Sequence, residues 1–319
     1  MAFTNPTYTT IALEKIVPQA INYYSQWAVC NAAFADMTSS TSELASKFGD
    51  FMSWVGIGVL VSPLVSAQVI GMTGDPIHAF STSIAFNVAL IALYITQFEE
   101  TLPKEKRKKF SFAGTNPFAF TRLFTGSTAV KKFASLYATM NFQQGTQISD
   151  INLVYMANDC NFSQALQNYS VTAYGTMMMT AGRLVKHSVK FFGESGHTSA
   201  SLFVSFIGFG LWSIPQAWSH FLGIFIQGLG YERLSTVYAA GVRHCANDGM
   251  GKGEASAAFS NLRGFTAIIY PLFYARIYAV GRSMGFPGLP FAWAAMMSII
   301  AEGLNRNIGA AAYKADDSN

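Results

Sequence analysis

The chain has 319 residues, of which 51% are hydrophobic and only 12% are charged, with a net charge of +4. An average soluble domain carries roughly 25% charged residues, so this composition, with 27 Phe and 14 Tyr, indicates that lipid bathes much of the surface. The modest, locally clustered charge argues against a nucleic-acid partner, and the three scattered cysteines support neither a disulfide framework nor a metal site.

Residues 1–50 form a polar or amphipathic N-terminal segment. Residues 1–10 contain no apolar stretch typical of a secretory signal. Residues 11–34 are moderately apolar but are interrupted by charged residues and a proline, so they suit either a weak membrane span or an interfacial amphipathic helix. Serine and threonine residues between 36 and 50 favour a helix that begins near Glu43.

The next segment, residues 51–97, predicts a transmembrane hairpin. Residues 51–71 and 77–97 contain no charged residue. Twenty-one residues of helix, at about 1.5 Å each, cover about 30 Å, which is the thickness of the hydrocarbon core of a bilayer. Gly74, Asp75 and Pro76 lie between the two stretches and indicate a short turn.

Residues 98–132 form a basic central loop. The loop holds eight Lys or Arg and three Glu, and eight minus three gives +5, more than the charge of the whole chain. Because Lys and Arg concentrate on the side from which a membrane protein is inserted, this loop is expected on the cytoplasmic, stromal or matrix side. An organelle membrane is compatible with this expectation.

Residues 133–305 predict a bundle of six further spans, followed by a polar tail at 306–319. The spans are 133–156, 163–182, 198–214, 217–238, 257–281 and 286–304. Basic residues recur in alternate loops, and Arg282 is the exception on the opposite side. This alternation is what the positive-inside rule requires of eight spans. The sequence therefore predicts an all-α, multi-pass integral membrane protein with about eight transmembrane helices.

Several short motifs follow one another along the chain in a recognisable order. Residues 43–67 contain Gly56, Gly58 and the pair Ser62-Pro63. Asn116-Pro117 follows the basic loop, residues 182–193 begin with Gly182-Arg183-Leu184, and residues 254–273 contain Pro271. In this order the motifs resemble the fifth helix, the start of the second half, the second-half loop motif and the eleventh helix of the major facilitator superfamily, in particular its drug-efflux and sugar-porter relatives.

The resemblance implies a complete C-terminal six-helix half preceded by a helix hairpin, with Pro63 and Pro271 at equivalent positions of two repeats. It also brings three departures. Helices one to three of the usual twelve have no counterpart, and the fourth is at best a remnant. The usual Gly-Pro pair is Ser62-Pro63, and Lys186 replaces an acidic residue of the loop motif that helps to gate alternating access.

Charged residues within the predicted spans are candidates for substrate binding or ion coupling. Asp150 and Arg276 lie at similar depth, and intramembrane charges normally face an interior and pair. A structural ion pair, or side chains that snorkel to the interface, is the alternative. Glu232, with the adjacent Arg233, and Arg263 form a second candidate cluster nearer the inner surface, where the structural alternative is stronger.

Amides and histidines offer weaker signals. Gln143 and Gln144 belong to a polar patch that either lines a solute path or forms hydrogen bonds between helices. His78 and His220 are compatible with a bound pigment, but a lone histidine is more often a hydrogen-bonding residue at a helix end. No cofactor is identifiable, bound lipids are expected, and the absence of any catalytic motif argues against an enzyme.

Two functions fit these observations. The departures from the transporter pattern favour a transporter-derived, non-catalytic accessory subunit of a larger membrane complex, with other membrane subunits and lipids as partners. Photosynthetic and respiratory assemblies are the obvious hosts. The alternative is a secondary solute transporter of the major facilitator superfamily that works as a dimer or with a partner chain.

Overall fold

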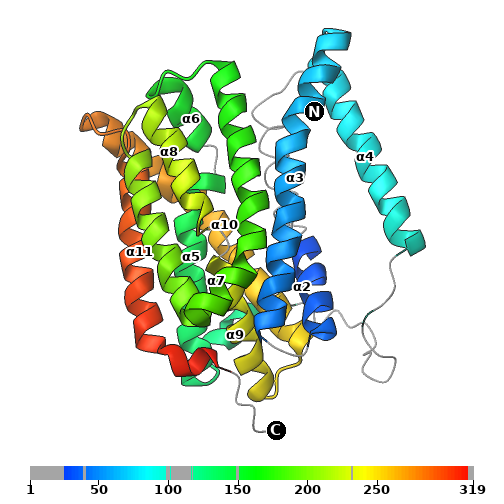
Figure 1. Ribbon diagram of the computed structural model, residues 1–319, viewed down its shortest axis with the longest axis vertical. Coiled ribbons are helices and arrows are strands. Elements are labelled where there is room, and N and C mark those ends of the chain that lie inside the picture. The colour runs from blue at the N-terminus through cyan, green and yellow to red at the C-terminus, as the bar shows by residue number, and fades with distance from the viewer. Residues whose placement is uncertain are drawn as a thin grey trace.

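The structure is a computed structural model that describes residues 25–38, 41–97, 101, 116, 118–148, 151–230 and 233–314. All regular elements within these ranges are helices, and most run nearly along one direction (Figure 1). We call the end with the α3–α4 turn the upper end and the end with the α9–α10 loop the lower end, as in Figure 1.

Three helices form the first part of the described chain. They are α2 (Ser25–Met37), α3 (Thr41–Thr73) and α4 (Pro76–Gln97). Gly74 has a φ of 71°, and the Asp75 carboxylate accepts a hydrogen bond from the Ile77 N–H at 2.9 Å. This turn reverses the chain where the sequence predicted it, whereas α3 begins ten residues before the predicted start of the span.

Only two helices in the described ranges are long and apolar enough to cross a membrane by length and composition alone. They are residues Glu43–Thr73, with a mean hydropathy of 1.9, and Ile77–Gln97, with a mean hydropathy of 1.7. The most apolar window of each helix has little buried surface in this structure, with 6% of the window buried in Glu43–Thr73 and none in Ile77–Gln97, whereas the first half of α3 packs against the bundle.

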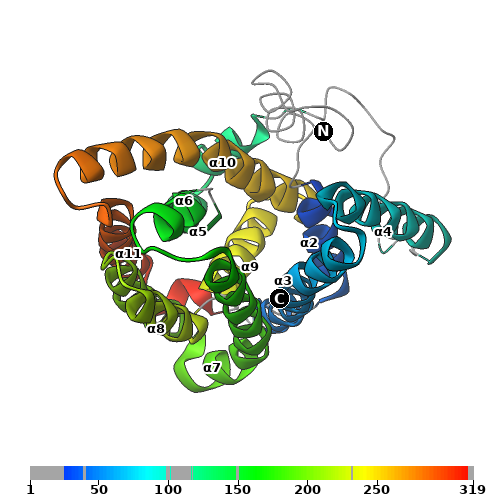
Figure 2. The same ribbon diagram turned by 90° about the horizontal axis from the view of Figure 1, so that it is seen from above.

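The remaining helices form one bundle. They are α5 (Thr128–Ile148), α6 (Ile151–Asn158), α7 (Gln164–Trp212), α8 (Ala217–Gly228), α9 (Arg233–Asn247), α10 (Lys252–Ser283) and α11 (Leu289–Ile308). The short 3-10 helices η3 (Ala119–Phe124) and η4 (Ala310–Tyr313) cap its lower end. Viewed from above, α5 and α6 stand inside a ring made by the other helices of the bundle (Figure 2).

The predicted loop between residues 182 and 198 is helical. α7 continues to Gly193, whose φ of 73° and ψ of 171° produce a kink, and then runs on to Trp212. A positive φ is open to glycine at little steric cost, so a single residue reverses the chain at the lower end where a loop was expected. The predicted central loop and tail also contain structure, because α5 begins at Thr128 and η4 follows α11.

Candidate functional site

Helix α9 lies between the first helices of the chain and the rest of the bundle. It contacts α3, α5, α7 and α10. Almost every residue from Arg233 to Val242 is buried, on all faces of the helix. A helix buried on every side belongs to the interior of a larger structure. Helix α9 is thus one of the elements that join the first helices to the bundle, together with α7, which packs along α3, and α10, which packs against α2.

An aromatic cluster joins the two parts around α9. We call it the junction cluster, and its members come from five helices: Phe34, Phe48, Tyr137, Tyr238 and Phe259. The Phe48 and Tyr238 rings meet edge to face with centroids 4.9 Å apart, and Tyr238 lies 5.7 Å from Phe259. Such pairs contribute about 0.5–1.5 kcal/mol each beyond the burial of their area. The cluster therefore closes the space between the two parts.

A hydrogen bond at the lower end strengthens the same junction. The Lys252 ammonium, at the start of α10, donates to the carbonyl oxygen of Ala35 in α2 at 3.0 Å. The junction is thus held by ring packing in its interior and by a charged donor at its rim.

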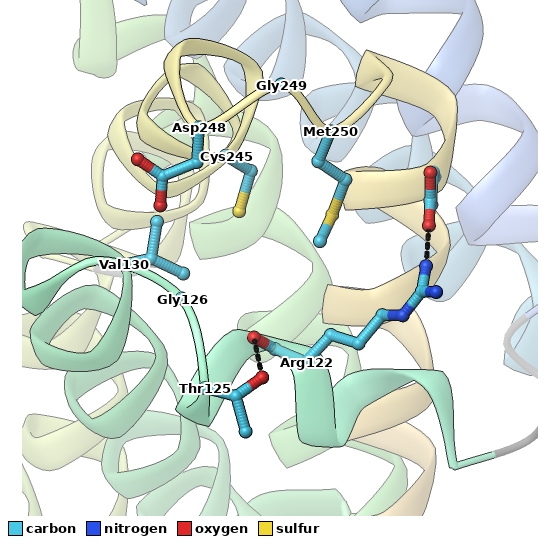
Figure 3. Close-up of a pocket in the computed structure, with 9 residues that line it drawn as sticks. Arg122, Thr125, Gly126, Val130, Cys245, Asp248, Gly249 and Met250 are labelled. Carbon is cyan, nitrogen blue, oxygen red and sulfur yellow. Dashed lines mark hydrogen bonds and ion pairs between the residues drawn. The ribbon is translucent and has the colours of Figure 1, made fainter.

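A polar pocket of about 300 Å³ opens beside this rim (Figure 3). Arg122 from η3 forms an ion pair with Glu254 from α10 across the pocket. On the other wall, Asp248 accepts a hydrogen bond from the Ser127 N–H at 2.9 Å. That hydrogen bond, aided by the Ser127 hydroxyl, lowers the pKa of Asp248. The two contacts fasten the segment before α5 to the α9–α10 loop and to the first turn of α10.

The η4 segment is clamped to α9. The Arg243 guanidinium donates to the carbonyl oxygens of Ala312 and Tyr313, at 2.7 and 3.0 Å. His244 Nε2 lies 2.8 Å from the same Ala312 oxygen, and the Tyr313 hydroxyl donates to Asn305 of α11 at 2.7 Å. The predicted polar tail is therefore partly wrong, because Tyr313 is 1% exposed and completes the lower end of the core.

At the upper end, the Asp159 carboxylate contacts two side chains from α10. The Arg282 guanidinium lies 3.3 Å from Asp159, and the Tyr278 hydroxyl donates to the other carboxylate oxygen. Arg282 also lies over the Tyr278 ring. Arg282, which broke the predicted charge alternation, is thus neutralised locally by a carboxylate.

The predicted coupling pairs are not assembled among the described residues. Asp150 and Glu232 lie outside those residues, so the pairs Asp150–Arg276 and Glu232–Arg263 stay predictions. Arg276 is exposed on α10, two residues and about half a turn from the buried Tyr274, so it faces away from the interior. Arg263 is half-buried on the same helix.

The amide patch has a structural role at one position. The Gln143 side chain donates to the Ala294 carbonyl at 3.2 Å and to the Ser298 hydroxyl, so it joins α5 to α11. Asn141 donates within α5, to Tyr137 at 2.8 Å, and Gln144 is buried beside it. For Gln143, the alternative of a hydrogen bond between helices matches the described contacts.

The motif residues fall in different places. Gly182 packs against α3, and Pro63 lies inside α3 with Pro271 inside α10. Gly58 does not belong to a close helix seam, because no atom lies within 4 Å of a side-chain carbon built there. The glycine of α3 that belongs to a close seam there is Gly56, which packs against Gly175 of α7. Lys186 is exposed on α7 rather than placed in a loop.

Two polar residues that the sequence analysis named, Arg233 and His220, are buried, and the sequence did not show which helices they join. Arg233 is fully buried at the start of α9 and donates to the Ser205 hydroxyl of α7 at 2.9 Å. His220 stacks on Trp212 with ring centroids 4.7 Å apart, and its Nε2 lies 3.1 Å from the Ser170 hydroxyl. No periodic signal marks either residue, because both depend on where α7 and α8 pack.

Metal chemistry finds no support in the ranges that the structure describes. They contain no group of three or more His, Cys, Asp and Glu side chains that could hold a metal ion.

Comparison with known proteins gives the fold. No protein-family model matches the sequence, and no curated protein matches it. Among solved structures, the human organic anion transporter MFSD10 superposes with a TM-score of 0.69, at 16% sequence identity, over 87% of this chain and 67% of that one. The chain therefore shares the fold of this transporter, a member of the major facilitator superfamily, which is the family that its sequence motifs resemble.

The comparison also bears on the two functions. The structural neighbour is a transporter, which is a non-enzyme class of protein. Nothing in the described structure or the comparisons supports the accessory subunit that the sequence analysis favoured. The transporter that it kept as the alternative is the better supported of the two.

Proposed function

We propose that this chain is a multi-pass membrane transporter that moves a small organic solute by alternating access. The junction cluster carries the proposal. In a transporter of this fold, solute crosses between two helix groups that rock against each other. Here α2 and α3 meet the α5–α11 bundle at that boundary, through Phe48 and Tyr238.

Membrane embedding is supported by the exposed surface. Large apolar side chains point outward along α4, α7 and α10, for example Ile95, Phe203 and Leu272. An apolar surface that extends over most of a molecule is unfavourable in water but favourable in lipid. We infer about eight spans, in which α5 with α6 and α8 with α9 each form one broken span and α7 forms two.

The orientation follows from charge. Most of the Lys and Arg residues of α5–α11 lie at the lower end, at the start of α5, before the kink of α7, near the α9–α10 loop and at the end of α11 (Figure 1). They are Lys131, Lys132, Arg183, Lys186, Lys190, Arg243, Lys252 and Arg306. We assign this end to the cytoplasmic, stromal or matrix side by the positive-inside rule. On this proposal, the junction cluster closes the solute pathway on that side.

Transport would require the cluster to open. Separation of α3 from α9 breaks the Phe48–Tyr238 contact, and separation of α2 from α10 breaks the Lys252–Ala35 hydrogen bond. Each of these two contacts is modest, so the junction beside α9 and α10 is held by several small terms rather than one large one. A barrier of this kind can be crossed repeatedly, as alternating access demands.

Uptake by reconstituted protein tests this proposal. The full chain is placed in proteoliposomes and challenged with a panel of radiolabelled organic anions, cations and sugars. Organic anions lead the panel because the structural neighbour is an organic anion transporter. Saturable uptake of at least one class, above that of empty liposomes, is expected. Folded protein that takes up none of them, and that purifies only with fixed partner subunits, would favour the accessory role instead.

A further inference from the structure

One face of α7 carries four basic side chains that have no partner among the residues that the structure describes. Arg183, Lys186, His187 and Lys190 are all exposed. Their spacing of three, four and seven residues places them on one side of a helix. We call this set the α7 basic stripe. None of the four forms a hydrogen bond or an ion pair through its side chain with any residue that the structure describes.

The opposite side of the same turns is packed. Gly182, Val185 and Val189 are buried, and Gly182 lies against α3. Asp50 follows Gly49 on that facing helix and is exposed, but no ion pair joins it to the stripe. The helix is therefore fixed in rotation by its buried face, which holds the stripe outward.

The depth of the stripe follows from the length of α7. Residues 164–182 contain no charged side chain, and these nineteen residues span about 28 Å of helix. That length nearly equals the hydrocarbon thickness of about 30 Å. The helix continues to the Gly193 kink, so the stripe begins where the hydrocarbon ends and runs through the layer of lipid headgroups.

Aromatic residues complete the surface. Phe191 is 81% exposed and Phe192 is 54% exposed, directly after Lys190. Exposed aromatic rings beside lysine and arginine are typical of helices that lie at a membrane interface, where the rings enter the acyl boundary and the charges meet headgroups.

We propose that the α7 basic stripe binds the phosphate headgroup of anionic phospholipids at the lower end of the protein. This inference rests on the membrane embedding in the proposed function. It adds a class of lipid that the protein binds at a defined site, beyond the lipid that surrounds it as a solvent. The group recognised is the phosphate of a headgroup whose net charge is negative, as in phosphatidylglycerol. Phosphatidylcholine, whose headgroup is neutral overall, should bind weakly.

Native mass spectrometry of the delipidated full chain in mild detergent tests the proposal. The variant Arg183→Gln/Lys186→Gln/Lys190→Gln is compared with the unaltered chain during titration with phosphatidylglycerol and with phosphatidylcholine of the same acyl chains. Each basic residue near an anionic surface contributes about fivefold in affinity, so we expect the variant to lose about 100-fold for phosphatidylglycerol and little for phosphatidylcholine.

A control with the same change in charge is available. Lys47, Lys131 and Lys314 are exposed lysines outside the stripe, and Lys47→Gln/Lys131→Gln/Lys314→Gln should retain the affinity for phosphatidylglycerol. An equal loss in the control, or no loss in the stripe variant, would overturn the proposal. Size-exclusion profiles in detergent confirm that both variants fold.

A third arm separates lipid from soluble phosphate. Inorganic phosphate, at an ionic strength matched with chloride, should leave the bound phosphatidylglycerol in place. Complete displacement by phosphate but not by chloride would assign the stripe to a soluble anion and contradict the lipid assignment. The readout of this experiment is lipid binding and not transport. Absence of lipid binding therefore does not change the interpretation of the uptake experiment, and absence of uptake does not change the interpretation of lipid binding.

Discussion

Gly49 in α3 and Gly182 in α7 face each other so closely that a side-chain carbon on either would overlap the carbonyl oxygen of the other. About two turns further up, Gly56 and Gly175 repeat the arrangement, with a carbon at Gly175 only 2.6 Å from the Leu60 nitrogen. Small residues let helix backbones approach in this way, so that packing replaces the hydrophobic effect in lipid. The contact between α3 and the bundle depends on these glycines.

Substitution Gly182→Ala is expected to destabilise the protein by about 1–3 kcal/mol, because α3 and α7 must move apart to admit the methyl group. The measurement is the thermal unfolding midpoint in detergent. Gly58→Ala is the matched control in α3, since open space surrounds that position. The control should be neutral or stabilising by up to about 1 kcal/mol, because alanine favours helix. Equal loss in both variants would contradict the close seam.

Release of η4 is the second prediction. Arg243→Gln removes the two hydrogen bonds to the Ala312 and Tyr313 carbonyls. Hydrogen bonds to a charged group contribute about 1.5–3 kcal/mol, so amide exchange in residues 309–314 should accelerate about 10- to 100-fold. Arg306→Gln, which breaks only an exposed pair with Glu302, should leave that exchange rate nearly unchanged. If amide exchange in residues 309–314 stays slow in the Arg243 variant, contacts other than those of Arg243 hold η4 in place.

The third prediction concerns pH. Hydrogen bonds from Ser127 lower the pKa of Asp248 in the folded protein, so the ionised carboxylate stabilises the fold above its ordinary pKa. This contribution is lost as the pH falls through the lowered value, below about pH 4. The unfolding midpoint of Asp248→Asn should therefore fall below that of the unaltered chain near neutral pH, and the gap should narrow on acidification. A gap that is independent of pH would refute this role.

At the upper end, the size of the effect should depend on what replaces Asp159. Asp159→Ala leaves the Tyr278 hydroxyl, which is largely buried, without its acceptor, at a cost of about 1–3 kcal/mol. Arg282→Gln removes only a half-exposed partner and should cost at most about 1 kcal/mol. Thermal unfolding of the two variants gives the comparison. The reverse order would mean that the ion pair, not the tyrosine hydrogen bond, stabilises this end.

The sequence predicted the fold well where its signal is local. The α3–α4 hairpin and its turn follow from charge-free runs of residues and from Gly74, and the order of glycine and proline motifs identified the transporter fold. These features depend on neighbours within one turn or one helix. They can be read without knowing which helices pack together.

The site could not be predicted in the same way. The partners of Tyr238 come from α3, α5 and α10, and nothing in its local sequence names them. The segment with Lys186 was read as a loop because its charges suit one, yet they lie on the exposed face of a helix that turns only at Gly193. The function favoured at first rested on departures from a family pattern, which carry little physical information about packing.

The most direct test of the proposed transport pathway is uptake by a protein whose junction can be locked. Phe48→Cys and Tyr238→Cys are introduced together after Cys30, Cys160 and Cys245 have been replaced by serine, and a short thiol-to-thiol cross-linker is added. Uptake of the solute found in the panel should stop on cross-linking and recover when the linker is cleaved by a reducing agent. Uptake that continues at the same rate in the fully cross-linked protein would contradict the account, because solute would then cross without separation of α3 from α9.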